Sequence, residues 1–292
     1  MEHGAATHAA GARQQHYAVP QPMPWPIMGS SALFLMAVGG VIVMNGQRAG
    51  WVSIGAGFIL LLYMMVRWFG EVIRESEGGK YGQREDLSFR WGMSWFIFSE
   101  VMFFGAFFGA LFWARLYSVP DLGSIESNAL MWPGFEPHWP SAGPAFEGQF
   151  TPMGAWGIPA INTLLLLSSG VTVTLAHYAL KENNRKQVIA FLALTVALGV
   201  LFLALQVDEY GHAMRELNLK LSTGIYGSTF FMLTGFHGFH VTCGAIMLTV
   251  MLVRCIRGHF TPDHHFGFEG VAWYWHFVDV VWLGLFIFVY WL

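Results

Sequence analysis

The sequence has little charge and little cysteine. Only 11% of its 292 residues are Asp, Glu, Lys or Arg, whereas 55% are hydrophobic. Soluble domains carry about 25% charged residues, so this composition excludes an ordinary water-soluble protein. The two cysteines, Cys243 and Cys255, fall on one predicted helix and are separated by about 18 Å of helical rise. They cannot form a disulfide with each other while that helix is intact.

A basic cluster and a targeting segment are also missing. The net charge is -3, and no patch of Lys and Arg suggests a nucleic-acid partner. The first 26 residues are polar and end in PQPMPWP, whose prolines prevent one continuous helix. They lack the apolar core of a signal peptide and, with one Arg, the basic character of a transit peptide. We predict a polar, proline-containing cytoplasmic tail over residues 1–26.

Long apolar runs are what the chain has in abundance. A helix needs roughly 20 residues to cross a bilayer core of about 30 Å, and the sequence contains seven runs of that kind. They cover residues 27–46, 51–69, 92–117, 158–180, 188–208, 226–253 and 271–292. A spanning segment must satisfy its backbone hydrogen bonds internally, and these runs lack the alternation of a barrel strand. The sequence therefore predicts an all-α integral membrane protein with seven transmembrane helices.

One long irregular stretch separates the third predicted helix from the fourth. Residues 118–157 contain six prolines and three tryptophans, a composition that does not favour a long helix. Long loops inside compact domains are uncommon unless they are packed or functional. We expect this segment to form a packed cap on the outer face.

Positive charge is distributed unevenly between the two sides that seven spans define. The side of the N-terminus collects eleven of the fifteen Lys and Arg residues, six of them within residues 13–90. Cytoplasmic loops carry the excess of Lys and Arg. We expect a cytoplasmic N-terminus and a periplasmic C-terminus in a bacterial inner (plasma) membrane, rather than the mitochondrial inner membrane.

Glu100, His237 and His240 are ionisable groups inside the predicted spans. Such groups are costly at bilayer depth and need a partner or a task. Glu100 opens the aromatic helix SEVMFFGAFFGALF, where it is either functional or satisfied by a neighbouring helix. His237 and His240 are one turn apart on the same face, so they either present two imidazoles to a metal or form hydrogen bonds within a packed bundle. The sequence near them contains no carboxylate ligand, which favours the hydrogen bonds.

A second polar pair, His276 and Asp279, lies in the last predicted helix. The two side chains share a face and can contact each other or another helix. A relay of protons and a clamp between helices are both compatible with this spacing. With one carboxylate and no charged continuation along the helix, the clamp is favoured.

Two interfacial stretches complete the candidate sites. They are RWFGEVIRES at residues 67–76 and VRCIRGHFTPDHHFGFE at residues 253–269. His259, His264 and His265 invite a metal interpretation, but adjacent histidines rarely ligate one ion together. Exposed structural loops and a lipid headgroup site remain the two alternatives.

Five segments carry a resemblance to a known family. They are RWFGEVIRES, FIFSEVMFFGAFFGALFW, NTLLLLSSGVTVTLAHYAL, GIYGSTFFMLTGFHGFHV and HHFGFEGVAWYWHFVDVVWLGLF. In this order and spacing, they resemble subunit III of the aa3-type cytochrome c oxidases, and the resemblance extends from the first span to the C-terminus. It does not cover the tail or the 118–157 loop.

This resemblance implies an architecture and a supporting role. The first two helices, within residues 27–90, would splay from a five-helix bundle in residues 91–292 and leave a V-shaped cleft for phospholipid. The subunit would bind neither haem nor copper and would flank subunit I, in a complex that also contains subunit II. It would sustain proton uptake into subunit I and protect it from inactivation during turnover, while the complex passes electrons from cytochrome c to oxygen. We therefore expect no catalytic residue, haem, copper or zinc in this chain.

The resemblance also suggests roles for individual residues. Glu100 matches the family's intramembrane carboxylate, and His237, His240, His276 and Asp279 become structural polar groups. Positions near lipid headgroups are matched by Trp68, Arg74, Glu75, Arg254, His259 and Phe260. The sequence departs from many related ones at Gly70 and Glu71, where a basic and an acidic residue are frequent, so one phosphate contact is absent.

Two other functions remain as alternatives. An independent transporter would use Glu100, Asp208, His276 and Asp279, but the sequence shows neither broken helices nor an inverted repeat. A quinol oxidase subunit III is the closer alternative. Since that version generally has five helices, the two extra N-terminal spans favour cytochrome c as the electron donor.

Overall fold

The computed structural model describes residues 22–146 and 148–292, and every regular element within these ranges is helical. Seven helices are long and apolar enough to cross a membrane, which confirms the predicted class. Of the predicted N-terminal tail, residues 1–21 lie outside the described residues. The chain divides into two compact units, one ending at Phe89 and the other covering Arg90–Leu292.

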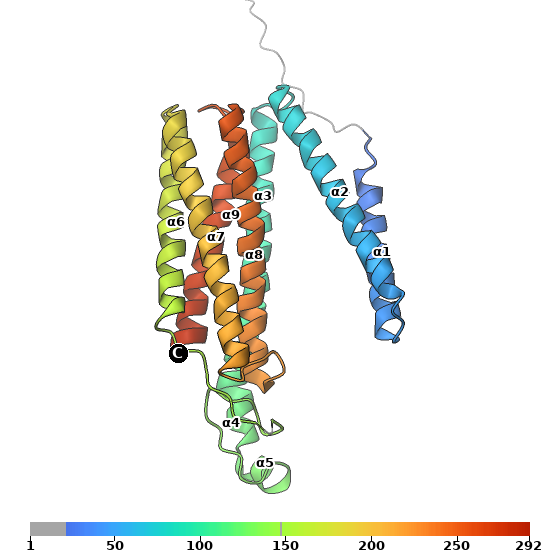
Figure 1. Ribbon diagram of the computed structural model, residues 1–292, viewed down its shortest axis with the longest axis vertical. Coiled ribbons are helices and arrows are strands. Elements are labelled where there is room, and N and C mark those ends of the chain that lie inside the picture. Colours follow the sequence, from blue (N-terminus) through green and yellow to red (C-terminus); the bar gives the residue numbers. More distant parts are fainter. Residues whose placement is uncertain (1–21, 147) are drawn as a thin grey trace, which may run out of the picture. The chain divides into compact units, whose positions relative to one another are not determined.

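The first unit is built on a helical hairpin. It consists of α1 (Trp25–Met44), α2 (Gly50–Glu77) and the first residues of α3 (Gln83–Trp113), seen in blue and cyan in Figure 1. α1 begins at a proline-flanked tryptophan, where the missing N–H of proline is tolerated. A short turn with Gly46 at φ 79° reverses the chain before α2.

Small residues hold α1 and α2 together. Gly39 and Gly50 face each other so closely that a Cβ added at Gly50 would lie 2.4 Å from the Gly39 carbonyl oxygen. One heptad further on, a Cβ at Gly57 would lie 2.7 Å from the carbonyl oxygen of Ala32. Membrane helices gain most of their association energy from close backbone packing, for which glycine and alanine are suited. The pair therefore depends on a stripe of small residues.

The second unit is a bundle of five long helices. Its elements, drawn from teal to red in Figure 1, are α3 from Arg90 onward with the π-helical η1 (Ala114–Ser118), α6 (Ile158–Lys181), α7 (Arg185–Arg215), α8 (Gly224–Arg257), and α9 (Phe266–Leu285) with η2 (Phe286–Trp291). These helices are longer than the predicted apolar runs, because polar residues at the ends of the runs are helical too. Asn184 caps α7 by accepting a hydrogen bond from the Gln187 N–H. Gly258, at φ 79°, ends α8 in the left-handed conformation.

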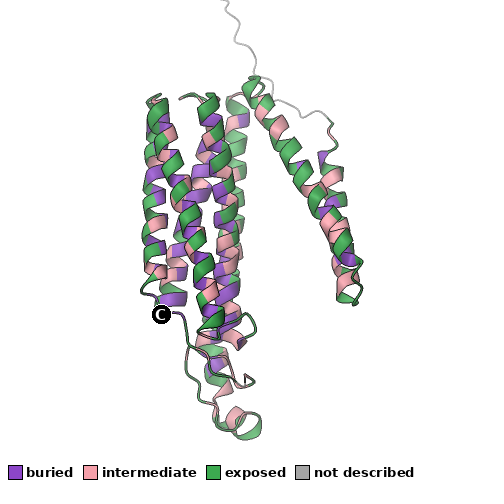
Figure 2. Cartoon of the chain, in the orientation of Figure 1, coloured by how far each residue is buried: buried purple, intermediate pink, exposed green. Residues whose placement is uncertain are grey.

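Aromatic side chains fill the centre of this bundle. Trp275 and Trp282 of α9 are fully buried, and Phe202 of α7 packs edge-to-face on Trp282 with centroids 4.8 Å apart. Gly199 and Gly244 leave room for the Trp275 ring, because a Cβ at either position would come within 2.8 Å of it. Figure 2 shows buried residues where these helices face one another and exposed residues on their outer surfaces. The core thus belongs to α6–α9, with α3 packed against it.

The segment between α3 and α6 folds onto one end of the bundle. It contains two short helices, α4 (Val119–Leu122) and α5 (Ile125–Leu130), followed by irregular chain. Phe150 stacks on Tyr226 of α8 with centroids 5.5 Å apart, and the Tyr226 N–H donates to the Ser141 carbonyl oxygen. Apart from residue 147, which is not described, the segment is tied to the start of α8 by its own backbone and aromatic groups.

Candidate functional site

Glu100 and His240 form a contact between α3 and α8. The Glu100 Oε2 and the His240 Nε2 are 2.9 Å apart, and His240 is largely buried. The His240 Nδ1 is 2.7 Å from the Phe236 carbonyl oxygen, to which it donates a proton. The ring therefore turns Nε2 toward the carboxyl group, with which it forms a hydrogen bond. Glu100 is thus satisfied by a neighbouring helix, one of the two alternatives that its sequence position left open.

Aromatic rings enclose this contact. Phe104 lies edge-to-face with the His240 ring at 5.1 Å, and Tyr274 stacks on it at 6.3 Å. Phe103 packs at 6.0 Å on the same imidazole. A hydrogen bond in so apolar a place is stronger than in water, and leaving either partner alone is costly.

His237 contacts a different helix from His240. Its Nε2 donates to the Val278 carbonyl oxygen of α9 at 3.2 Å, and its ring packs at 5.1 Å from Trp282. The two histidines share one face of α8, as the sequence predicts. However, the Nε2 of His237 contacts α9, whereas the Nε2 of His240 contacts α3. This arrangement favours hydrogen-bonded packing over one metal shared by both rings.

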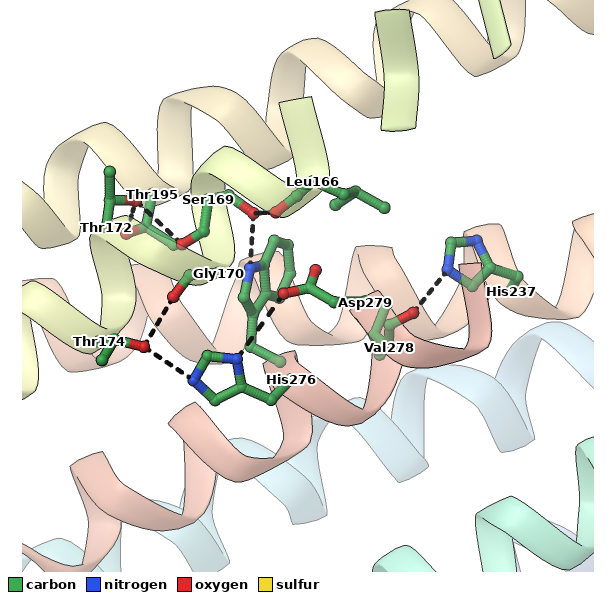
Figure 3. Close-up of polar contacts among 11 residues, drawn as sticks. Leu166, Ser169, Gly170, Thr172, Thr174, Thr195, His237, His276, Val278 and Asp279 are labelled. Carbon is green, nitrogen blue, oxygen red and sulfur yellow. Dashed lines mark hydrogen bonds and ion pairs between the residues drawn. The ribbon is translucent and has the colours of Figure 1, made fainter. Parts of the chain in front are cut away.

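His276 and Asp279 connect α9 to α6, as Figure 3 shows. The His276 Nε2 is 3.2 Å from the Thr174 hydroxyl, and its Nδ1 is 3.8 Å from the Asp279 Oδ2. The Asp279 carboxyl lies against Gly170, where an added Cβ would be 2.4 Å from Oδ2. The pair therefore acts as the predicted clamp, with Thr174 as its partner on the other helix.

Hydroxyl and indole groups extend this network along α6. The Trp275 Nε1 donates to the Ser169 hydroxyl at 2.8 Å, and the hydroxyl groups of Thr172 and Thr195 are 2.8 Å apart (Figure 3). Sequence reasoning missed these residues, because serine and threonine inside an apolar run carry no charge that marks them as paired. The run SSGVTVT, in which small polar residues alternate with apolar ones, is the one local signal.

The predicted headgroup residues of the second unit come together at the end of α8. The Arg254 guanidinium lies 4.3 Å from the centroid of the Phe260 ring, a cation–π geometry. The His259 N–H donates to the Arg254 carbonyl oxygen at 3.1 Å. Arg254 is only 8% exposed, so most of its side chain is packed within this unit.

In the first unit, the predicted headgroup residues lie near the end of α2. Trp68 is 41% exposed, and Arg74 is exposed with its Nε donating to the Gly70 carbonyl oxygen. Glu75 is occupied locally, because it accepts a hydrogen bond from Tyr81 at 2.7 Å and contacts Lys80 at 3.2 Å. Burial, together with the Glu75 carboxylate, raises the pKa of Tyr81.

The fold and these contacts define a polytopic α-helical membrane protein whose buried polar side chains join its helices. The chain matches the family "Cytochrome c oxidase subunit III" over residues 15–292. It is 42% identical to the cytochrome c oxidase subunit 3 of Prototheca wickerhamii, with 95% of this chain and 98% of that protein covered. The Struthio camelus and Cyprinus carpio proteins of the same name are 42% and 43% identical over 96% of this chain and 98% of theirs.

The chain therefore belongs to the cytochrome c oxidase subunit III family, as the sequence resemblance indicates. Membership places it in an oxidase complex of aerobic respiration, as an integral membrane subunit beside other oxidase subunits.

Proposed function

We propose that this chain is the non-redox supporting subunit of a proton-pumping cytochrome c oxidase. Haem a and copper belong to partner subunits I and II, and cytochrome c supplies the electrons to the complex. The chain sustains proton uptake by subunit I and protects that subunit from inactivation during turnover. Its membrane is a bacterial plasma membrane, with the basic ends of α2 and α8 on the cytoplasmic side.

One observation carries this proposal: several ionisable side chains inside the bundle contact groups on other helices. Glu100 contacts His240, His237 contacts a backbone carbonyl, and His276 contacts Thr174. A redox site needs several ligands that converge on one position. The imidazoles of His237, His240 and His276 contact different helices, which supports a structural role within the complex.

The number of long helices supports cytochrome c as the electron donor. The hairpin of α1 and α2 precedes the five-helix bundle in sequence, and the five-helix quinol-oxidase version generally lacks such a pair. This favours cytochrome c over a quinol. Asp208, the remaining carboxylate of the transporter alternative, is exposed, whereas Asp279 is buried against α6. The two carboxylates therefore give no support to a common transport path.

Phospholipid is the second part of the proposal. Arg74 and Trp68 offer an exposed guanidinium and an exposed indole at the end of α2, which suits a phosphate group and its acyl-chain roots. In the other unit, the stacked Arg254 and Phe260, with His259 beside them, offer a fixed positive charge. Each basic residue near an anionic headgroup is worth about 1 kcal/mol.

The supporting role is tested by purifying the oxidase with and without this chain. We expect the depleted complex to keep its haem spectrum and its initial rate of oxygen consumption. It should pump fewer protons per electron and lose activity sooner during turnover. Immediate loss of oxygen consumption with intact haem, or an unchanged pumping ratio and lifetime, would refute the proposal.

The lipid is tested in the complete complex with Arg74→Ala combined with Arg254→Ala. Arg257→Ala is the matched control, because this exposed arginine lies one turn after Arg254. Mass spectrometry of the intact complex should show loss of anionic phospholipid in the double variant alone, together with a shorter turnover lifetime. An unchanged lipid complement would mean that these arginines serve only as topological anchors.

A further inference from the structure

Three side chains of types that bind metals lie close together in the second unit, near the end of α6 at Lys181. They are His177 of α6, His265 just before α9, and Glu269 in the first turn of α9. One ligand atom from each side chain lies within 4.8 Å of the other two. Two imidazoles and one carboxylate form a ligand set typical of zinc sites that keep an open coordination position.

His265 makes a hydrogen bond of the kind that orients many metal-bound histidines. Its Nδ1 is 3.2 Å from the Thr261 carbonyl oxygen, to which it donates a proton. This hydrogen bond fixes the tautomer and leaves Nε2 as the atom with a lone pair. Metal-bound histidines usually donate their other ring N–H to a backbone carbonyl or a carboxylate in this way.

His177 faces the same place from the neighbouring helix. Its Nε2 is buried and, among the described residues, has no hydrogen-bond partner. The ring packs edge-to-face on His265 with centroids 5.2 Å apart, and the ring of Phe268 lies 5.7 Å away. A buried imidazole nitrogen that lacks a hydrogen bond costs free energy, and a metal ion offers it a partner.

Glu269 supplies the carboxylate and is itself held in place. Its Oε1 is 2.5 Å from the Arg90 Nη1, which leaves Oε2 as the second oxygen of the group. Carboxylates that bind metals are commonly fixed by such outer contacts. Arg90 and Lys181 also add positive charge near His177, which reduces the affinity for a cation.

We propose that His177, His265 and Glu269 bind one divalent transition-metal ion of the zinc class, with water at the fourth position. Ligand atoms 2.0–2.1 Å from a tetrahedral ion lie about 3.4 Å apart, so a pair at the 4.8 Å limit must close by about 1.4 Å. All three are only partly buried, which gives the ion a path from solvent. Zinc has no redox chemistry, so this site is independent of the supporting role proposed above.

The site modifies the expectation that this chain holds no metal. That expectation followed from the family resemblance, and the sequence considered His265 only together with His259 and His264, since adjacent histidines rarely ligate one ion together. The structure instead places His265 beside His177, which the sequence gives no reason to connect.

The test is zinc binding to the complete, chelator-treated oxidase, measured by equilibrium dialysis and elemental mass spectrometry. Relative to the unmodified complex, His177→Ala and His265→Ala should each remove one zinc per complex. Glu269→Gln should weaken binding about 10- to 100-fold, since it replaces the charged ligand by a neutral one. His264→Ala is the matched control, because this neighbouring histidine is outside the cluster, and it should bind zinc normally.

Two further variants allow for an alanine variant that fails to assemble, and a spectrum identifies the ligands directly. If an alanine variant fails to assemble, His177→Gln and His265→Gln retain polarity and similar size while removing the imidazole. Zinc-edge X-ray absorption should show two imidazole nitrogens at the site. Equal zinc binding by the unmodified complex and the His177 and His265 variants would overturn the proposal, as would an equal loss in His264→Ala, which would indicate only surface histidine binding.

Discussion

Helices α1 and α2 meet through glycine and alanine, whereas the helices of the second unit are tied by carboxyl, imidazole, hydroxyl and indole groups. In the first unit, Gly39, Gly50 and Gly57 bring two backbones together, and one side-chain hydrogen bond, from Ser53 to the Leu35 carbonyl oxygen, crosses between α1 and α2. In the second unit, Glu100–His240 and Thr174–His276 each cross from one helix to another.

The difference follows from how much surface each helix buries within its own unit. Buried residues make up 11% of the most apolar window in α1 and in α2, against 28% to 56% in α6, α7, α8 and the last span. α3 is also buried to 11%, but it reaches the interior of the second unit through Glu100. A polar side chain facing lipid is costly, so a helix pair with little interior must use close backbone contact. A five-helix bundle has an interior in which polar groups can be satisfied. The helix contacts of the two units should therefore respond differently to substitution.

Overpacking the glycine stripe should have the largest effect. Gly39→Leu forces a side chain against the Gly50 carbonyl oxygen and Ile54, both 2.7 Å from an added Cβ. We expect a loss of about 3 kcal/mol in the stability of the helix pair, at the upper end for overpacking. The control is Gly40→Leu, next in sequence, where an added Cβ meets nothing within 4 Å.

This effect is measured as the midpoint of thermal unfolding and the amount of chain retained in the purified complex. Equal behaviour of the two leucine variants would show that the small residues do not join α1 to α2.

The next largest effect is expected where the clamp of the second unit meets α6. Gly170→Ala places a Cβ 2.4 Å from the Asp279 Oδ2 and pushes the carboxyl away from its site. We expect a loss of about 1–3 kcal/mol, measured by chemical or thermal unfolding. Gly238→Ala in α8 is the control, because it has open space and alanine favours a helix. A neutral Gly170→Ala would mean that the carboxyl does not lie against α6.

The positions of the long helices were predictable from the sequence, because a helix that crosses the bilayer needs about 20 apolar residues and such runs are easily found. The ends were less predictable. α2 continues from the apolar run through the polar RWFGEVIRES to Glu77, and α7 continues to Arg215. Helical backbone remains favourable outside the hydrocarbon region, so hydropathy alone does not mark where a helix ends.

A smaller effect is expected from one hydroxyl group of the α6–α9 network. Ser169→Ala leaves the buried Trp275 Nε1 without its acceptor and should cost about 1 kcal/mol. Ser168→Ala, one residue earlier and exposed, should stay within about 0.5 kcal/mol of the original. Unfolding of the two variants gives the comparison directly. An equal loss of stability in both variants would mean that replacing serine in α6 is destabilising in general, and that the hydrogen bond to the Trp275 indole makes no separate contribution.

Which polar groups meet could not be predicted from the sequence. Glu100 and His240 were both identified as candidates, but nothing local links residues on α3 and α8 that are so distant along the chain. The clamp of His276 and Asp279 was inferred from its spacing, while its partner Thr174 was missed. Spacing along one helix determines a shared face, and only the packing of helices determines what that face contacts.

We expect the smallest effect from Glu100→Gln, which should leave catalysis nearly unchanged. This variant tests the central claim that the intramembrane polar groups join helices. Glu100→Gln keeps a hydrogen-bonding group of similar size beside His240 but removes the acidic proton. The measurement is the initial rate of oxygen consumption with reduced cytochrome c, in purified complex of verified haem content. We predict a rate close to that of the unmodified complex. Loss of oxygen consumption with haem content and assembly unchanged would contradict the account, because it would give Glu100 a direct part in the reaction.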